Sequence, residues 1–149
     1  MSGDAIDDPQ ARAERAAAAM YAGDSATRSL GIVVEDVAPG TATARLVVSA
    51  AMVNGHGIAH GGYIFLLADT AFAFACNTYG ATVAGAAEIV FVRPVSEGDE
   101  LVAEARERVR FGRNGMYDVT VRGARGEVVA EFRGHSHRLR PPPEHVSPM

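Results

Sequence analysis

One acidic residue, Asp69, lies in the middle of an otherwise apolar segment, residues 63–76. An ionised carboxylate among apolar side chains loses hydration, and that loss costs free energy unless something compensates it. A carboxylate in such surroundings can serve as a nucleophile or as a general base. Buried acids with a purely structural role also occur, so the carboxylate alone leaves both interpretations open.

The segment before this carboxylate, NGHGIAHGG at residues 54–62, is rich in glycine. Gly61 and Gly62 stand where an apolar helix would begin, and the first N–H groups of a helix have no acceptor within it. Such N–H groups can hold an oxyanion and contribute roughly 3 to 4 kcal/mol to a tetrahedral transition state. Asn54 adds an amide that could hold a carbonyl group or a water molecule, although Asn-Gly is also a common turn pair. The segment therefore indicates either an ordinary turn or a site for a carbonyl oxygen.

The spacing of the two groups constrains how they could act together. Gly61 and Asp69 are eight residues apart, which in one helix corresponds to about 12 Å along the axis. One carbonyl carbon cannot contact both. If both act on the same carbonyl, two copies of the helix must lie antiparallel, with Gly61 of one chain facing Asp69 of the other. This reasoning predicts a homodimer whose sites are shared between chains.

Other reactive residues lack the neighbours that their chemistry would need. His56 and His60 have the spacing of a metal-ligand pair, but they lie in a glycine loop without a third ligand in view, which favours a role in the loop. Cys76 has no activating neighbour and is interpreted as a packed core thiol. Ser136 and His137 lack the turn that exposes a serine nucleophile. We expect neither a metal site nor a serine hydrolase.

The composition is that of one soluble domain. The chain has 149 residues, 48% of them hydrophobic and 21% charged, with a net charge of -4. Without a basic surface, nucleic acid is a poor partner. The single cysteine, the acidic N-terminus without a signal sequence and the lack of a long apolar run predict a cytoplasmic protein that does not cross a membrane.

The order of predicted elements gives an α+β domain with a helix on one face of a sheet. We expect an N-terminal arm (residues 1–9), one domain (10–140) and a proline-rich tail (141–149). Within the domain, the pattern predicts helices at 10–22 and 62–77, a hairpin of strands at 30–37 and 41–49, and a loop at 50–60. Four further strands, expected at 82–92, 100–111, 116–123 and 127–135, suggest a meander.

Four stretches together resemble a known family. They are MVNGHGIAHGGYIFLLADTAFAFACN at residues 52–77, FVRP at 91–94, GMYD at 115–118 and FRGHSHR at 132–138. Their order and spacing are similar to those of the phenylacetate-pathway (PaaI-type) thioesterases of the hotdog superfamily. This resemblance implies a hotdog fold, in which a curved antiparallel β-sheet wraps a long central helix. It also implies dimers with a continuous sheet, commonly paired into a homotetramer.

The activity that the resemblance implies is hydrolysis of an acyl-CoA, such as (hydroxy)phenylacetyl-CoA or a related aryl or short-to-medium acyl-CoA, to the free acid and CoA. No separate cofactor is implied, since coenzyme A is part of the substrate. By resemblance, Asp69 attacks the thioester or activates water, and the Gly61 amide polarises the carbonyl. Asn54 helps to hold the carbonyl or the attacking water, and Thr70 orients the carboxylate or the water.

Further residues are assigned to substrate binding. Tyr63, Phe65 and Phe72 are candidates for the acyl pocket, although each could equally belong to the core, and His60 and Gly62 flank the oxyanion position.

Arginines near the strand ends are candidates for the CoA nucleotide, namely Arg113, Arg133 and Arg138. Two alternative functions stay open. One is a non-hydrolytic acyl-CoA sensor or carrier, which usually has an attached partner domain. The other is a hotdog enoyl-CoA hydratase, which would be expected to show a catalytic histidine in its own motif.

Overall fold

The N-terminal helix begins one residue earlier than the sequence indicates. A computed structural model describes residues 8–141, so the predicted arm and tail lie almost entirely outside the described residues. Helix α2 spans Pro9–Gly23, with Asp8 as its N-cap. The Asp8 carboxylate accepts a hydrogen bond from Ala11 N at 3.1 Å. Pro9 suits the first helical position because a proline has no N–H that needs an acceptor there, so it belongs to the helix and not to the arm.

A short second helix, α3 (Ser25–Ser29), was not predicted. Asp24 ends α2 and caps α3, because its carboxylate accepts a hydrogen bond from Thr27 N at 3.0 Å. The sequence signal was present in the Asp24-Ser25 pair after Gly23, but a five-residue helix has too few positions to show a periodic apolar face.

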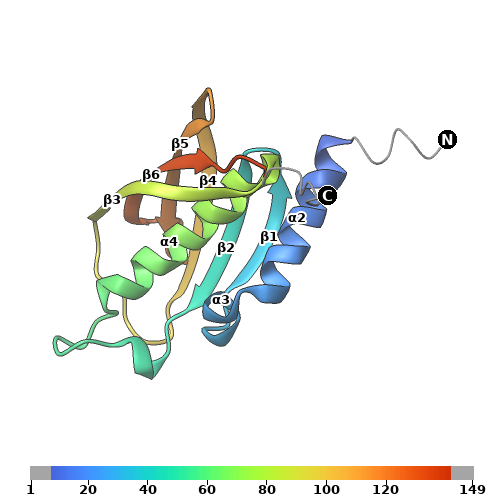
Figure 1. The fold of residues 1–149 in the computed structure, drawn as a ribbon. Helices are drawn as coiled ribbons and strands as arrows, with labels where there is room; N and C mark the ends of the chain where they lie inside the picture. The colour runs from blue at the N-terminus through green and yellow to red at the C-terminus, as the bar shows by residue number, and fades with distance from the viewer. Residues whose placement is uncertain (1–7, 142–149) are drawn as a thin grey trace, which may run out of the picture.

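Six antiparallel strands form one sheet (Figure 1). They are β1 (Val33–Ala38), β2 (Thr41–Val47), β3 (Thr82–Phe91), β4 (Glu100–Phe111), β5 (Asn114–Arg122) and β6 (Val128–Arg138). The predicted hairpin is confirmed as β1 and β2, joined through Pro39 and Gly40.

The position of β3 differs from the predicted meander. Strands β4, β5 and β6 do follow one another, but the sheet order is β1-β2-β4-β5-β6-β3. Strand β4 pairs with β2, and β3 pairs with β6 at the opposite edge. After β2 the chain forms the central helix and then β3 at the far edge of the sheet. It then returns as β4, which pairs with the side of β2 that β1 does not occupy. Such long-range pairing leaves no local trace in the sequence, so adjacency along the chain was a poor guide.

The predicted loop and central helix lie between β2 and β3. A 3-10 turn, η1 (Ala50–Met52), is followed by an irregular loop and by α4 (Gly61–Cys76). A second 3-10 turn, η2 (Asn77–Tyr79), ends the helix. At this end the Asn77 side-chain amide donates to Ala73 O at 2.8 Å and to Thr82 O at 3.1 Å, which joins α4 to the start of β3.

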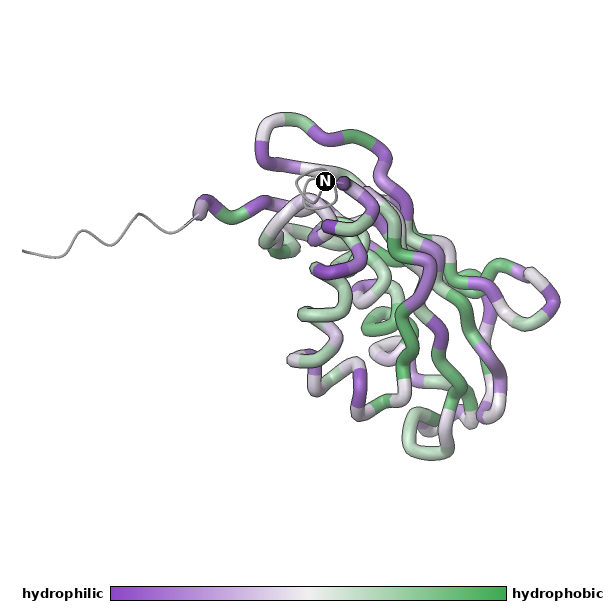
Figure 2. Tube along the Cα trace, turned by 90° about the vertical axis from the view of Figure 1, so that its right-hand side faces the viewer, coloured by the Kyte–Doolittle hydropathy of each residue, from purple (hydrophilic) through white to green (hydrophobic). Residues whose placement is uncertain are grey.

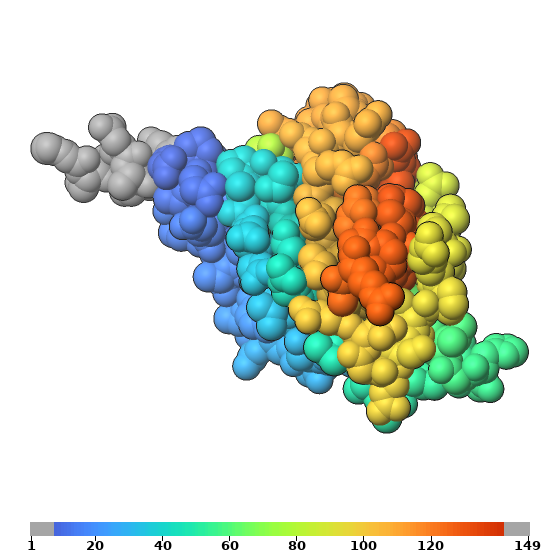
Figure 3. Space-filling model, turned by 180° about the vertical axis from the view of Figure 1, so that it is seen from behind, coloured from blue at the N-terminus to red at the C-terminus, as the bar shows by residue number. Residues whose placement is uncertain are grey.

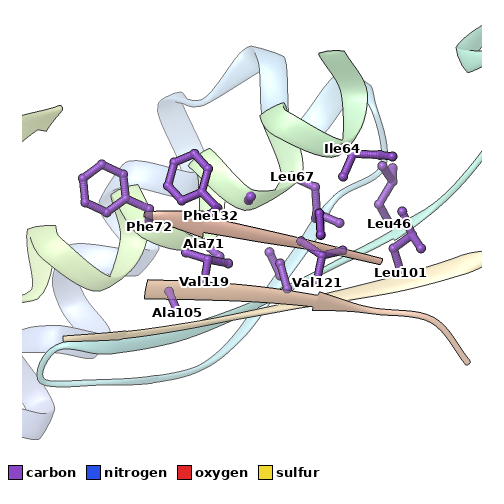
Figure 4. Close-up of a cluster of buried hydrophobic side chains, with 14 of the residues drawn as sticks. Leu46, Ile64, Leu67, Ala71, Phe72, Leu101, Ala105, Val119, Val121 and Phe132 are labelled. Atoms are coloured by element: carbon purple, nitrogen blue, oxygen red, sulfur yellow. The ribbon is translucent and has the colours of Figure 1, made fainter. Parts of the chain in front are cut away.

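Helix α4 packs along the concave face of the sheet and forms the core with it (Figure 4). Ala68, Ala71 and Ala75 have no exposed surface, and their small side chains let the helix approach the strands closely. The larger core side chains that meet across this interface are Ile64, Leu67 and Phe72 from α4 and Leu46, Leu101, Val119, Val121 and Phe132 from the sheet. A sheet curved around one central helix confirms the hotdog fold.

The sheet has two unlike faces. Hydropathy alternates along the strands, as expected where one face is buried and the other is solvated (Figure 2). Figure 3 shows the outer face, where the strands lie side by side from β1 and β2 in cyan to β3 in yellow. Phe132, Gly134 and Ser136 of β6 point to the core, while the alternate residue Arg133 lies on the outer face.

The contact between Phe72 and Gly134 gives a test of this packing. A Cβ atom at Gly134 would lie 2.7 Å from two ring atoms of the buried Phe72, which has no room to move. Gly134→Ala is therefore expected to lower the free energy of unfolding by about 1 to 3 kcal/mol, the usual cost of overpacking. Urea denaturation measures this. Gly23→Ala, where nothing lies within 4 Å, is the control and should change stability little. Equal stabilities of the two variants would contradict the packing described.

Candidate active site

The N-terminus of α4 leaves one backbone donor free. His60 is the N-cap: its Nδ1 accepts a hydrogen bond from Gly62 N at 2.9 Å, and its carbonyl oxygen accepts one from Tyr63 N at 3.0 Å. Within residues 8–141, Gly61 N–H has no acceptor. The first N–H groups of a helix carry its positive partial charge. His60 therefore satisfies its neighbours and leaves Gly61 N–H available to an external oxygen.

The side chain of Asn54 has a fixed orientation. Its Oδ1 accepts hydrogen bonds from His56 N at 2.9 Å and from Ile58 N at 3.4 Å. The backbone closes the same turn, because Asn54 N donates to Ile58 O at 2.8 Å. With the amide oxygen used by the loop, the Nδ2 group is left as a donor without a partner among the described residues. Asn54 can therefore donate to a carbonyl or water oxygen, and it is not set up to accept from one.

The Gly61 amide and Asn54 line the same cavity, which has a volume of about 440 Å³. Phe91, at the end of β3, forms another part of its wall. A Cβ atom at Gly61 would lie 2.9 Å from Phe91 Cζ, so the tip of the ring rests on the glycine. The remaining lining residues are Ile58, Ala59, Ile64, Val92, Arg93 and Pro94. Two residues that each carry a hydrogen-bond donor unused by the described residues thus line one largely apolar pocket.

Asp69 lies on the same helix as Gly61 but away from this cavity. Helix α4 is continuous over Gly61–Cys76, so the expected separation of about 12 Å along its axis holds within one chain. The carboxylate is half-buried, and burial raises its pKa above the usual range for an aspartate. No hydrogen-bond donor among the described residues contacts it. The structure therefore presents an unpaired carboxylate on the partly open side of the helix.

Thr70 follows Asp69 but is directed to a different side of α4. Its hydroxyl is buried and lies 3.5 Å from the hydroxyl of Thr27 in α3. The Thr27 hydroxyl in turn donates to the Asp24 carboxylate at 2.7 Å. This chain of contacts joins α3 to α4. The orienting role assigned to Thr70 from the resemblance stays a prediction, and any influence on Asp69 would act through the placement of the helix.

The three candidate acyl-pocket side chains lie in different surroundings in the structure. Phe72 is buried in the core, with ring centroids 5.6 Å from Tyr117 and 5.8 Å from Phe132, and it does not line the cavity around Gly61. Phe65 is half-buried against Phe132, at 5.4 Å between centroids. Tyr63 is half-buried beside the His60 ring. Phe65 and Tyr63 thus stay near the open side, and Phe72 is a core residue.

The three candidate arginines also lie in different surroundings. Arg133 donates two hydrogen bonds to the Asp118 carboxylate, at 2.7 and 3.0 Å, which lower the pKa of that carboxyl group. This ion pair lies on the outer face of the sheet and occupies the Arg133 guanidinium. Arg113 and Arg138 instead line one small pocket near the end of α4, and Arg138 N donates to Arg113 O at 2.7 Å. Of the three arginines, the fold brings only these two together.

Sequence reasoning missed Phe91 and Arg93 as site residues, although both belong to the FVRP stretch that carried the resemblance. It also missed Arg110, which lines the pocket of Arg113 and Arg138. The Arg110 charge is compensated there, because its guanidinium pairs with Glu107 and lies 3.5 Å from the centre of the Tyr79 ring.

Cys76 is buried, as predicted for a core thiol. Burial raises its pKa to about 12, so the thiol stays protonated near neutral pH and is a poor nucleophile.

Sequence comparison identifies the class of protein. Residues 56–130 match the Thioesterase superfamily. The acyl-coenzyme A thioesterase PaaI of Escherichia coli is 45% identical over 122 residues, which cover 81% of this chain and 87% of the relative. This chain therefore belongs to the thioesterase superfamily.

Solved structures support the same assignment. The E. coli PaaI protein from the phenylacetic acid degradation operon aligns with a TM-score of 0.84 and 43% identity, over 87% of this chain and 94% of that one. A variant of the phenylacetic acid degradation protein PaaI from Thermus thermophilus aligns with a TM-score of 0.76 and 39% identity, over 78% of this chain and all of that one. Within residues 8–141, helices are too short or too polar to cross a bilayer.

The burial of Asp69 predicts that this residue costs stability. Burial raises its pKa in the folded state above the unfolded value, so between these two pKa values the folded chain binds more protons than the unfolded one. Stability must then fall as the pH rises through that interval. Asp69→Asn removes the charge and is expected to raise the free energy of unfolding near pH 7, with the gain shrinking below about pH 4.

Urea denaturation at a fixed protein concentration measures both effects, since association would change the apparent stability. A gain that does not vary with pH, or a loss near neutral pH, would show that the carboxylate is compensated in the folded protein.

Proposed function

We propose that this protein is a cytoplasmic acyl-CoA thioesterase of the PaaI type, which hydrolyses (hydroxy)phenylacetyl-CoA or a related aryl or short-to-medium acyl-CoA. The observation that carries the proposal is the Gly61 N–H, which has no acceptor among the described residues. Gly61 shares a cavity with Asn54 and begins a helix that also holds Asp69, whose carboxylate has no donor in the same part of the chain. The likeness to the E. coli acyl-coenzyme A thioesterase supports the substrate class.

Two donors from different elements are available to the thioester carbonyl. The Gly61 amide comes from the N-terminus of α4, and Asn54 Nδ2 comes from the loop before it. As a nucleophile adds, the carbonyl oxygen gains negative charge, which these donors and the helix dipole stabilise. Because His60 and the loop backbone hold both donors in place beforehand, little reorganisation is needed during the reaction.

The carboxylate that acts on this carbonyl comes from a second copy of the chain in our proposal. Within one chain, α4 holds Gly61 and Asp69 about 12 Å apart along its axis. Two antiparallel copies of α4 related by a two-fold axis bring Gly61 of each chain to Asp69 of the other. Such a dimer has two equivalent sites.

The surface beside α4 is suited to a second copy. Among the described strands, β3 is an edge strand that pairs only with β6, and most of its ten residues are exposed on both faces. Glu88 is its only charged residue, so the edge lacks the charges that usually protect a free edge from pairing. On α4 the half-buried residues Phe65, Leu66, Asp69 and Ala73 recur at helical spacing. Pairing of β3 with its copy would cover both features in one interface. A homotetramer, implied by the resemblance, stays a prediction.

The chemical step has two balanced forms. With Asp69 as general base, the carboxylate takes a proton from water, the resulting hydroxide adds to the thioester carbon, and the C–S bond breaks to release CoA thiolate, which is then protonated. With Asp69 as nucleophile, a carboxylate oxygen adds instead, CoA leaves, and water hydrolyses the mixed anhydride. Both forms require an ionised Asp69. Since its pKa is raised, activity should increase with pH through that raised pKa.

The phosphates of CoA need cations, and Arg113 and Arg138 are our candidates. Within the described residues neither forms an ion pair, and both line the pocket at the end of α4. In the antiparallel dimer this pocket of one chain lies beyond the α4 N-terminus of the other. Arg133 is not proposed to bind the phosphates, because its guanidinium already donates two hydrogen bonds to the Asp118 carboxylate.

The role of Asp69 is tested by thiol release from acyl-CoA substrates. Asp69→Asn should lower kcat by about 10²- to 10⁴-fold, the usual contribution of a catalytic base, while fold and dimer are retained. The control is Asp36→Asn, the same chemical change at an exposed residue of β1, which should retain wild-type turnover. Full turnover by Asp69→Asn would exclude the proposed role. Tight binding of acyl-CoA by a wild-type protein that releases no thiol would indicate a sensor or carrier.

The role of the Gly61 amide is tested by a matched pair of variants. Gly61→Ala and Gly61→Pro both add a Cβ beside Phe91, but only proline removes the N–H. Proline fits the first helical position, and the His60 backbone, at φ -62° and ψ 131°, suits a residue before proline. We expect kcat of Gly61→Pro to be roughly 10²- to 10³-fold below that of Gly61→Ala. Equal rates would remove this amide from the mechanism.

Mixing the two inactive variants tests whether the site is shared. In a heterodimer of Asp69→Asn and Gly61→Pro chains, one site has both groups intact and the other has neither. Random pairing of equal amounts should restore about one quarter of the wild-type activity. No recovery on co-expression, with heterodimers verified by mass spectrometry, would show that each chain builds its own site.

A further inference from the structure

Phe91 is a large apolar side chain with an unusual placement. It is 51% exposed, although its ring belongs to the wall of the cavity that holds the Gly61 amide. Single exposed apolar side chains are common on protein surfaces and need no explanation. What distinguishes Phe91 is its contact with Gly61: the three atoms nearest to a Cβ atom at that glycine would all be atoms of the Phe91 ring, at 2.9, 3.2 and 3.4 Å.

The ring is held from a rigid base. Phe91 pairs with Ala130 as the last residue of β3, and the following residues Val92 and Arg93 both donate backbone hydrogen bonds to Val129 O, at 2.8 and 3.2 Å. The backbone on either side is therefore fixed to β6. The nearest ring atoms, Cζ and the two Cε atoms, belong to the tip of the ring, so the tip meets Gly61 while much of the ring surface stays exposed.

We propose that Phe91 is a specificity-determining residue, whose exposed ring packs against the acyl group of the substrate and favours aryl over alkyl groups. This proposal rests on the proposed function. An oxygen that accepts a hydrogen bond from Gly61 N–H lies about 2.9 Å from that nitrogen. The ring tip lies against the same glycine, so we expect the first atoms of the acyl chain to pass beside the ring, and aromatic rings pack favourably at centroid separations of roughly 4.5 to 7 Å.

The rest of the cavity is compatible with an aryl group. Ile58, Ile64 and Pro94 provide further apolar surface beside Phe91. A cavity of about 150 Å³ with apolar walls is large enough to bind benzene, and this one has a volume of about 440 Å³. The site therefore has room for a phenyl ring beside Phe91.

The test compares phenylacetyl-CoA with hexanoyl-CoA, an alkyl substrate of similar size. Phe91→Leu keeps an apolar side chain but removes the aromatic ring, and it should lower the ratio of kcat/KM for aryl over alkyl substrate by about 2- to 12-fold, the size of an aromatic pair contact. Val90→Ala is the control, because Val90 is 63% exposed on the same strand but does not line the cavity, and it should leave the ratio unchanged. An unchanged ratio in Phe91→Leu would overturn the proposal.

Sedimentation and binding measurements distinguish contact of Phe91 with the substrate from contact with a second protomer. Sedimentation that shows Phe91→Leu dissociating into monomers would mean that a second protomer, and not the substrate, covers the ring, which also overturns the proposal. Dissociation constants for both acyl-CoAs, measured in the Asp69→Asn background with and without Phe91→Leu, test recognition without hydrolysis. If the wild type hydrolyses neither substrate, the proposed function fails. The Phe91 proposal then stands if the ratio of dissociation constants shifts by the same factor, and falls if it does not.

Discussion

The distance between the Gly61 amide and the Asp69 carboxylate is the constraint on which the site depends. Both belong to α4, which is uninterrupted over Gly61–Cys76, so their separation of about 12 Å along the axis cannot be closed by a loop movement. The two groups become parts of one site only when a second helix runs in the opposite direction. In the proposed dimer, the exposed edge strand β3 and the partly open side of α4 would face that second helix.

Helix α4 has to satisfy two opposing requirements. Its alanines and large apolar residues bury it in the curved sheet, and this packing makes it a stiff support for the site. The same surroundings raise the cost of an ionised Asp69. A carboxylate with little hydration is also a stronger base and nucleophile, since its charge is poorly screened. In the proposed mechanism the helix therefore loses some stability in exchange for a more reactive carboxylate, a common arrangement at active sites.

Much of the fold and of the candidate site around α4 could be predicted from the sequence, because these features depend on local signals. The start of α4 at the Gly61-Gly62 pair, the glycine loop and the partial burial of Asp69 all follow from residues close together in the chain. The position of β3 could not be predicted, because strand order depends on contacts between distant segments. Similarly, Phe65 and Phe72 read alike as apolar helix residues, and only the space above Gly134 shows that Phe72 belongs to the core.

The free edge of β3 has a consequence for the enzyme at low abundance. The hydrophobic core belongs to one protomer, but each protomer holds only half of each proposed site, so activity per chain should depend on mass action. In the proposed dimer, dilution below the dissociation constant of the pair would abolish catalysis. Cellular concentration would then act as a threshold for thioester turnover, without any effector molecule.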